Sequence, residues 1–404
     1  MSASASAVHA AVTAAYRNEW GQVVATLIGL VGDWDLAEDC TQDAFAAALT
    51  TWPRDGIPDR PGAWLTTTAR HRATDRLRRD AVGRAKLRQL AVLDQDPEGP
   101  DSIADERLRL IFTCCHPALP FEARVALTLR TLAGLSTAEI ARGFITAETT
   151  MAQRLVRAKR KIAEAGIPYR VPSADLLPQR LAAVLAVIYL IFNEGFGAQD
   201  ESRSLTAEAI QLGRMLTRLM PREAEPHGLL ALMLLHEARR AARTHDGVLI
   251  TLEHQDRSRW DRALIDDGLA TLDRALAQRS VGPYQIQAAI AACHATAPDT
   301  AGTNWRRIVT LYDELTTLAP SPVVDLNRAV AVAMADGVPA GLALVDDLAR
   351  SGRLDKYYLL PATRADLLRR AGRVAEAKAA YEQALRLAPT EAERSFLAAR
   401  LTQL

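Results

Sequence analysis

LSTAEIARGFITAETTMAQRLVRAKRKI, residues 135–162, is the stretch that decides the fold class. Ser136 and Glu139 have the three-residue spacing of a capping box, which predicts that a helix starts here. Gly143 is suited to end that helix, and Thr146 can cap the one that follows. Two helices joined by so short a turn indicate a helix-turn-helix unit.

The second helix of this unit, Ala147–Ile162, has an apolar and a polar side. Met151, Leu155 and Ala158 recur at spacings of four and three, so they are expected to face the core. The polar side is left for DNA, as a recognition helix in the major groove requires. We name as candidate DNA contacts Glu148, Thr149, Thr150, Gln153, Arg154, Arg157, Lys159 and Lys161. The motif alone is common to many DNA-binding regulators.

Basic charge is concentrated in two segments, although the net charge of the chain is only +1. Eight basic residues stand against two acids from Arg70 to Arg88, and six against one from Arg142 to Lys161. Such segments suit phosphate backbones, because neutralising phosphates releases counterions. A solvated charged helix face is the alternative interpretation, and two such segments within recognisable motifs favour nucleic acid.

An acidic segment precedes both basic ones. Five acids and no base occur within eleven residues: Asp33, Asp35, Glu38, Asp39 and Asp43. Here the chain resembles the extracytoplasmic-function sigma factors of bacterial RNA polymerase. The stretches that carry the resemblance are Asp39–Phe45 (DCTQDAF), Ala63–Leu65 (AWL) with Ala69–Arg79, and Thr150–Ala158. Their order and spacing match the family over about residues 8–165.

The resemblance implies an all-α fold with sigma domain 2 over 8–80, a linker over 81–105, and sigma domain 4, the helix-turn-helix, over 106–166. It implies that the β′ clamp of core RNA polymerase is bound by Asp35, Glu38, Asp39, Gln42 and Asp43. It implies that the melted −10 strand of promoter DNA is bound by Arg70, His71, Arg72, Asp75, Arg76, Arg78 and Arg79. It implies that the candidate DNA contacts of Ala147–Ile162 are −35 contacts. Trp64 is a candidate stacking platform, with a buried core position as the alternative. Many family members have Lys where this chain has Ala152, so promoter preference does not carry over.

The rest of the chain, residues 175–404, is expected to be a helical-repeat domain. The spacing of Gly372, Ala377, Tyr381, Ala384 and Pro389 resembles the second helix of a tetratricopeptide unit. A partial copy, Ile308 to Pro320, stands 69 residues earlier, which is two periods of about 34 residues. Generic helical hairpins are the alternative. A short extended piece is expected only around 248–252, after the turn at Asp246-Gly247.

The chain also resembles a subgroup of these sigma factors that carries a tetratricopeptide-like extension. The matching stretches are Ile111–Pro117, Tyr189–Gly195, Gln255–Trp260 and Pro283–Gln287. The resemblance implies that the extension regulates or supports activity. We expect it to contact the sigma domains intramolecularly through Gln255, Asp256, Arg257, Arg259 and Trp260; a surface helix cap is the alternative for this polar run.

The sequence also argues against several other classes of protein. The start of the chain lacks the pattern of a signal peptide. The most apolar run, Leu181–Phe192, is too short to span a bilayer and is expected to be a buried helix. Four cysteines without a repeating spacing argue against a disulfide framework and for a cytoplasmic protein. Cys114-Cys115-His116 lacks zinc-ligand spacing, so we expect buried thiols and no metal. We also expect no cofactor and no enzyme activity. A free-standing regulator with a ligand- or partner-sensing repeat domain is the alternative function.

Overall fold

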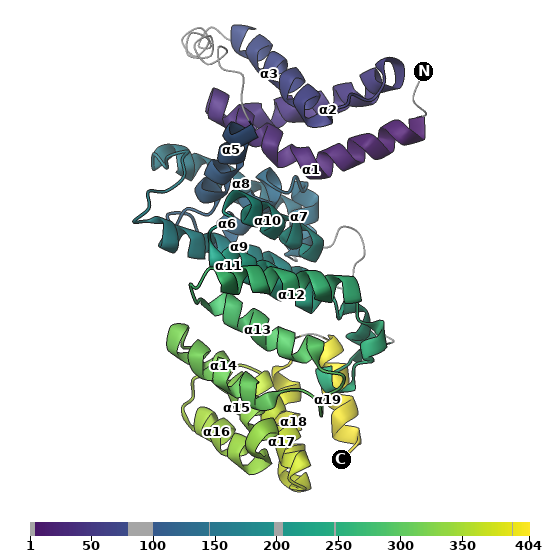
Figure 1. Ribbon diagram of the computed structural model, residues 1–404, viewed down its shortest axis with the longest axis vertical. Helices are drawn as coiled ribbons and strands as arrows, with labels where there is room; N and C mark the ends of the chain where they lie inside the picture. The colour runs from purple at the N-terminus through teal and green to yellow at the C-terminus, as the bar shows by residue number, and fades with distance from the viewer. Residues whose placement is uncertain (1–4, 80–99, 145, 198–204, 246–247, 390) are drawn as a thin grey trace. The chain divides into compact units, whose positions relative to one another are not determined.

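The computed structural model describes residues 5–79, 100–144, 146–197, 205–245, 248–389 and 391–404, and Figure 1 shows their helices. The chain forms two compact units, unit 1 (Met1–Leu219) and unit 2 (Met220–Leu404). Helices dominate both, which confirms the all-α expectation. A short antiparallel pair, β1 (Thr244–His245) and β2 (Val248–Leu249), occupies part of the segment expected to be extended. The turn expected at Asp246-Gly247 lies outside the described residues.

Unit 1 begins with three helices, α1 (Ala5–Val31), α2 (Trp34–Asp55) and α3 (Pro61–Arg79), which pack on one another. Asp33 caps α2, because its side chain accepts hydrogen bonds from the backbone N–H groups of Asp35 and Leu36. Helix α2 continues to Asp55, with Pro53 in its last turn. Pro61 opens α3, at a position where the missing N–H costs nothing.

Four helices follow in unit 1: α5 (Pro100–Cys114), α6 (Phe121–Thr131), α7 (Thr137–Gly143) and α8 (Glu148–Glu164). Helix α5 begins inside the range expected to be a linker, and residues 80–99 of that range lie outside the described part of the chain. The capping box is confirmed: the Ser136 N–H donates to Glu139 (2.7 Å) and the Glu139 N–H donates to the Ser136 hydroxyl (3.2 Å). The expected cap at Thr146 is wrong, since Ala147 occupies the N-cap of α8 without a side-chain bond.

Two more helices, α9 (Leu177–Gly197) and α10 (Leu205–Leu219), complete unit 1 and pack against each other. The apolar run Leu181–Phe192 lies within α9 and supplies buried side chains such as Val187 and Ile188. It is therefore a core helix, as expected. None of the helices in the described ranges has the length and apolar character needed to cross a membrane.

Unit 2 is a succession of helices, each packed on the next. They are α11 (Ala224–Glu237), α12 (Arg262–Ala277), α13 (Pro283–Thr296), α14 (Trp305–Leu318), α15 (Pro322–Asp336), α16 (Val338–Arg350), α17 (Leu359–Arg370), α18 (Val374–Leu387) and α19 (Glu391–Thr402). Three short 3-10 helices, η1 (Arg240–Ala242), η2 (Leu252–His254) and η3 (Arg257–Arg259), lie between α11 and α12.

The sequence spacing attributed to a repeat corresponds to helix ends in unit 2. Gly337 (φ 104°) separates α15 from α16, and Gly372 (φ 73°) lies between α17 and α18. Positive φ favours glycine, because a Cβ would be strained there. Ala377, Tyr381 and Ala384 are buried on α18, as the pattern predicted. Paired helices are thus present, and their assignment to the tetratricopeptide type remains a prediction.

Candidate polymerase and DNA interface

Helix α8 carries the exposed polar side that the sequence predicted. Its apolar stripe, Met151, Leu155, Ala158 and Ile162, is buried against the rest of unit 1. On the other side, the exposed residues are Glu148, Thr149, Thr150, Gln153, Arg157 and Lys161, with Arg154 half-buried. The separation of the two sides follows from the helical period, which places residues three and four apart on one face.

The exposed side of α8 borders a hollow of about 470 Å³. Arg154, Arg157 and Lys161 of α8 line it, opposite Pro120 and Glu122 at the start of α6. The Arg157 guanidinium bonds the Gln153 backbone oxygen (3.3 Å) and its amide oxygen (3.4 Å), so it orients that side chain. Basic groups around a helix groove are suited to phosphate oxygens, and an oriented amide is suited to a base edge.

Lys159 is the exception among the candidate −35 contacts. Its ammonium lies 2.8 Å from Asp35 and 2.8 Å from Glu38 of α2, and only 14% of the side chain is exposed. Arg130 of α6 completes the group at 3.1 Å from the other Glu38 oxygen. We call Glu38, Lys159 and Arg130 the inner cluster. Lys159 thus contacts α2 in this structure, and its contact with DNA remains a prediction.

Burial opposes the charge of Lys159, yet its pKa is raised above the usual value. Burial by itself would lower this pKa, and the charge of Glu38 with the hydrogen bonds to Asp35 and Glu38 outweighs it. Glu38 is 4% exposed and was a candidate clamp contact. In this structure it faces domain 4 rather than the surface, because residues 38 and 39 lie about 100° apart around a helix.

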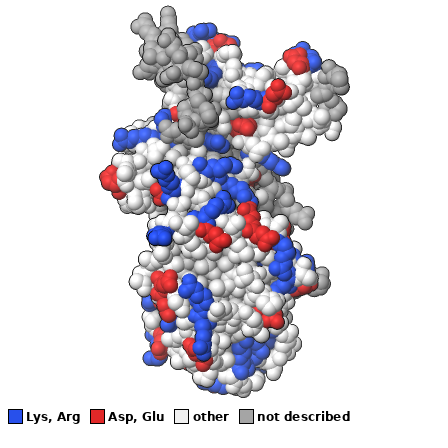
Figure 2. Space-filling model, viewed as in Figure 1, with Lys and Arg blue, Asp and Glu red and all other residues white. Residues whose placement is uncertain are grey.

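Two other acids of α2, Asp39 and Asp43, contact α3 near the surface. Arg76 bridges Asp39 (3.2 Å) and Asp43 (2.7 Å), and Arg72 approaches Asp43 at 3.9 Å. We call these four residues the outer cluster. Asp35 and Gln42 are also exposed, so four of the five clamp candidates are accessible. Figure 2 shows acidic and basic side chains next to one another over the N-terminal helices.

Helix α3 presents most of the candidate −10 contacts to solvent. The exposed residues are His71, Arg72, Asp75, Arg78 and Arg79, while Arg70 and Arg76 are half-buried. Trp64 is half-buried and lies edge-on to the buried Trp52, with 5.6 Å between ring centroids. This packing favours the core role for Trp64 over the stacking role.

Contacts that the sequence did not predict hold α1 against the second group of helices. The Tyr16 hydroxyl donates to the Gly134 carbonyl and the Tyr169 hydroxyl to that of Ala25, both at 2.8 Å. A Cβ at Gly21 would lie 2.6 Å from the Leu132 carbonyl, so only glycine allows this approach. These pairs stand more than 100 residues apart, and nothing in their local sequence marks them as partners.

The candidate contact residues of the extension have partners inside unit 2. Trp260 is 5% exposed and Gln255 is 8% exposed. Arg257 donates to the carbonyls of His294 and Ala297, and Asp256 caps η3, as the alternative interpretation held. Arg259 is exposed. Separately, within unit 1, the Gln211 amide of α10 donates to the Arg17 carbonyl of α1 at 3.2 Å.

Cys114 and Cys115 are buried thiols, as the sequence predicted. Burial raises the pKa of both, that of Cys115 to about 11, so neither thiol is a ready metal ligand at neutral pH. In the part of the chain that the structure describes, no group of three or more metal-ligating side chains converges.

Comparison with known families matches three parts of the chain. Residues 16–82 match Sigma-70 region 2, residues 109–162 match Sigma-70, region 4, and residues 180–276 match a family of unknown function, DUF6596. The region 2 match covers most of α1 with all of α2 and α3, and the region 4 match ends within α8.

Among curated proteins, the uncharacterized protein R00370 of Rhizobium meliloti (strain 1021) is 42% identical over 95% of this chain and 93% of its own length. The probable ECF RNA polymerase sigma factor SigI of Mycobacterium tuberculosis is 28% identical over 41% of this chain and 59% of its own length. No solved structure matches. With regions 2 and 4 in order on exposed acidic and basic helices, the chain belongs to the extracytoplasmic-function sigma-70 factors and carries a helical C-terminal extension.

Proposed function

We propose that the protein is a transcription initiation factor that binds core RNA polymerase and directs it to specific promoters. One observation carries the proposal: α2 and α8, which resemble the clamp-binding and −35-reading helices, each present polar side chains to solvent. A free-standing regulator needs the second feature but not the first. A factor that works with RNA polymerase acts in the cytoplasm.

The β′ clamp contact would use Asp39, Gln42 and Asp43, which successive turns of α2 bring to one face. Arg76 already compensates the two carboxylates within unit 1. Because this pair is solvent-exposed, its contribution to folding is small, and the acids can exchange Arg76 for basic groups of a partner.

Affinity for core polymerase tests this contact. Asp39→Lys with Asp43→Lys should abolish co-purification with core polymerase while the far-UV circular dichroism stays unchanged. Asp55→Lys, an exposed acid at the end of the same helix, is the control with the same kind of charge change. Equal retention of both variants on core polymerase would exclude this face as the clamp contact. DNA binding without any polymerase binding by the wild type would favour the free-standing regulator.

The −35 contact would use two kinds of side chain on α8: some that bind phosphates and some that read base edges. Arg154→Ala should weaken all promoters alike and reduce the salt slope by about one, whereas Arg157→Ala should also alter base preference, because Arg157 orients Gln153. Gln153→Ala or Glu148→Ala should change the preferred −35 sequence, with each lost base contact costing about 1–3 kcal/mol. Binding profiles over a promoter library would separate the two. An unaltered profile for both Gln153 and Glu148 variants would remove them as base readers.

The extension would regulate or support activity through contact with the sigma domains. The contacts of α10 with α1 and of α9 with α6 in unit 1 support this part of the proposal. Transcription in vitro with the full chain, with residues 1–219 and with residues 1–171 tests it. We expect truncation to change the activity. Equal activity of all three proteins would indicate that the extension serves an outside partner instead.

A further inference from the structure

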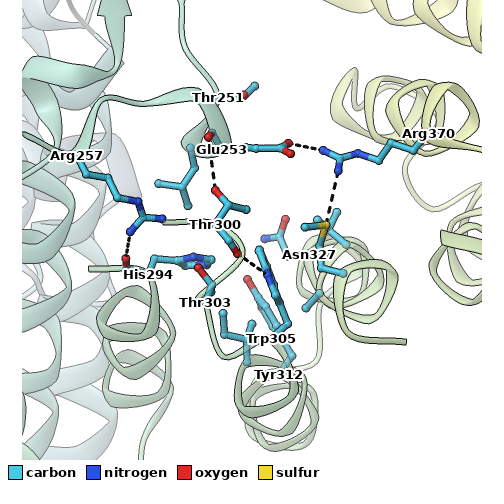
Figure 3. A pocket seen from close by; sticks show the side chains of 15 residues that line it. Thr251, Glu253, Arg257, His294, Thr300, Thr303, Trp305, Tyr312, Asn327 and Arg370 are labelled. Carbon is cyan, nitrogen blue, oxygen red and sulfur yellow. Dashed lines mark hydrogen bonds and ion pairs between the residues drawn. The ribbon is translucent and has the colours of Figure 1, made fainter. Parts of the chain in front are cut away.

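Unit 2 contains a pocket of about 260 Å³ that none of the roles above uses (Figure 3). Its walls come from η2, the end of α13, α14, α15 and the last residue of α17. Pockets that take small molecules are mostly apolar with a few placed polar groups, and their volumes begin at about 300 Å³. At about 260 Å³ this pocket lies just below that range, so it suits a ligand smaller than a drug-sized molecule.

One wall of the pocket is aromatic and aliphatic. Trp305, Ile308 and Tyr312 of α14 face Val330 and Met334 of α15 across it. The Trp305 ring is fixed, because its Nε1–H donates to the Thr300 carbonyl at 3.2 Å and its face meets His294 edge-on at 5.2 Å. Figure 3 shows Trp305 and Tyr312 side by side in this wall. A rigid aromatic wall offers apolar contact to a ligand at little entropic cost.

Arg257 lies on another side of the pocket. It donates to the carbonyls of His294 (2.5 Å) and Ala297 (2.8 Å), and its guanidinium lies 4.6 Å from the Trp260 ring centroid. Within the described residues it forms no direct ion pair, and the charge of Asp299 acts on it only through space. By contrast, Arg370 on the α17 side is paired directly with Glu253 and Asp366. Of the two arginines that line the pocket, Arg257 is therefore the one without a directly paired carboxylate.

The surroundings of Arg257 add to this positive potential. The Arg239 guanidinium lies 2.8 Å from the ring of His236 and is buried. Burial and the charge of Arg243 lower the pKa of Arg239 to about 10. Burial and the charges of Arg239 and Arg257 lower the pKa of His294 to about 4, so His294 stays neutral at pH 7. Burial, the larger cause, opposes charge of either sign, whereas the two arginines favour an anion over a cation.

We propose that this pocket binds a small organic anion, with its carboxylate or phosphate on Arg257 and its apolar body against Trp305, Ile308 and Tyr312. Asn327, exposed at the rim, adds an amide that can donate and accept. The Glu253–Arg370 ion pair closes one side of the pocket, so a small molecule fits better than a chain of residues. The extension is then a ligand-sensing module.

The test uses the full chain labelled with 5-fluorotryptophan and followed by fluorine NMR. Trp305→Phe assigns the Trp305 signal among the six tryptophans. The probes are 3-phenylpropionate, phenyl phosphate, neutral 3-phenylpropionamide and cationic 3-phenylpropylamine. At least one of the two anions should shift the Trp305 signal saturably, and bind at least tenfold more tightly than the amide and the amine. Which anion binds distinguishes carboxylate from phosphate.

Variants locate the charge that the probes detect. Arg257→Gln should weaken anion binding at least tenfold, whereas Arg259→Gln, exposed on the same 3-10 helix, should leave it unchanged. Asn327→Phe, which fills the rim without touching Arg257, should also block binding and covers the case in which Arg257→Gln does not fold. Equal binding of anion and amide, equal effects of the two arginine variants, or a Trp305 signal that moves only with an acidic peptide would overturn the proposal.

The measurement involves neither DNA nor polymerase. Its failure would leave the sigma assignment intact, and loss of polymerase binding would not affect it.

Discussion

The acids of α2 form two clusters that differ in burial, although they are interleaved in the sequence. In the outer cluster, Asp39 and Asp43 have side chains that are 61% and 38% exposed. In the inner cluster, Glu38 is 6% exposed at its side chain and lies between Lys159 and Arg130. The difference teaches that one acidic segment has two environments: a surface suited to a partner, and a buried contact of α2 with α6 and α8.

The two clusters should respond in opposite ways to substitution. An exposed ion pair contributes little to stability, because water screens it and ordering its side chains costs entropy. A buried pair is expensive to form, yet removing one member leaves an uncompensated buried charge. Substitutions in the outer cluster should therefore weaken polymerase binding more than they destabilise the fold. Substitutions in the inner cluster should destabilise unit 1 more than they weaken polymerase binding.

The largest expected effect belongs to Glu38→Gln. This change leaves Arg130 without its carboxylate and Lys159 with Asp35 alone, so the free energy of unfolding of unit 1 should fall by about 3–5 kcal/mol. Urea unfolding followed by tryptophan fluorescence would measure the loss, and hydrogen exchange would localise it to α2 and α8. Glu38→Met with Arg130→Met and Lys159→Met is the matched control, because removing all three charges should restore much of the stability. A loss below 1 kcal/mol would mean that the inner cluster is not formed in solution.

A smaller effect is expected from Gly21→Ala, which disturbs the same domain contact without changing a charge. The new Cβ would lie 2.6 Å from the Leu132 carbonyl, a backbone atom that cannot turn aside. Overpacking of this kind costs about 1–3 kcal/mol, and the better helix propensity of alanine offsets up to about 1 kcal/mol. Gly29→Ala is the control on the same helix, since its Cβ would meet the movable end of the Glu106 side chain. Equal stability of the two variants would contradict the close approach at Gly21.

Local patterns were sufficient to predict part of this arrangement. The capping box at Ser136, the buried stripe of α8 and the core helix at Leu181–Phe192 depend on neighbours within a few turns, and all are confirmed. The clamp and promoter contacts depend on other molecules and remain predictions. The position of Lys159 could not be predicted, because its partners lie on a helix 121 and 124 residues earlier.

The same limit applies to the candidate sites of the extension. Gln255–Trp260 is polar in sequence and resembles a surface, yet Trp260 packs under Arg257 within unit 2. The pocket beside it draws residues from η2 to α17, more than 100 positions apart. Periodicity identifies the buried side of each helix but not the loop that covers it.

Substituting Asp39 in the outer cluster should cost much less stability than substituting Glu38 in the inner cluster. Asp39→Asn should lower the free energy of unfolding by no more than about 0.5 kcal/mol, because Asp39 and Arg76 are both exposed. The same variant should weaken core polymerase binding measurably. The two quantities can be compared on one preparation by urea unfolding and by a retention assay. A stability loss as large as that of Glu38→Gln would end the distinction between the clusters.

The smallest effect is a change in one proton equilibrium, and it reports the inner cluster directly. The pKa of Lys159 is raised above 10.5, so its favourable contribution to folding is complete at neutral pH and is lost only as the pH rises through the raised value.

The chain has five lysines, so nitrogen NMR of the ammonium groups can follow each one, with Lys159→Arg to assign the signal. In the wild type, the Lys159 signal should persist above pH 10.5; in Glu38→Gln it should disappear at lower pH, because the largest of the charges that raise the pKa is gone. Asp39→Asn, which changes the neighbouring acid on the other side of α2, should leave the Lys159 titration where it was. Identical titrations in wild type and Glu38→Gln would show that Lys159 does not contact Glu38 in solution, and α8 would then be free to present this lysine to DNA.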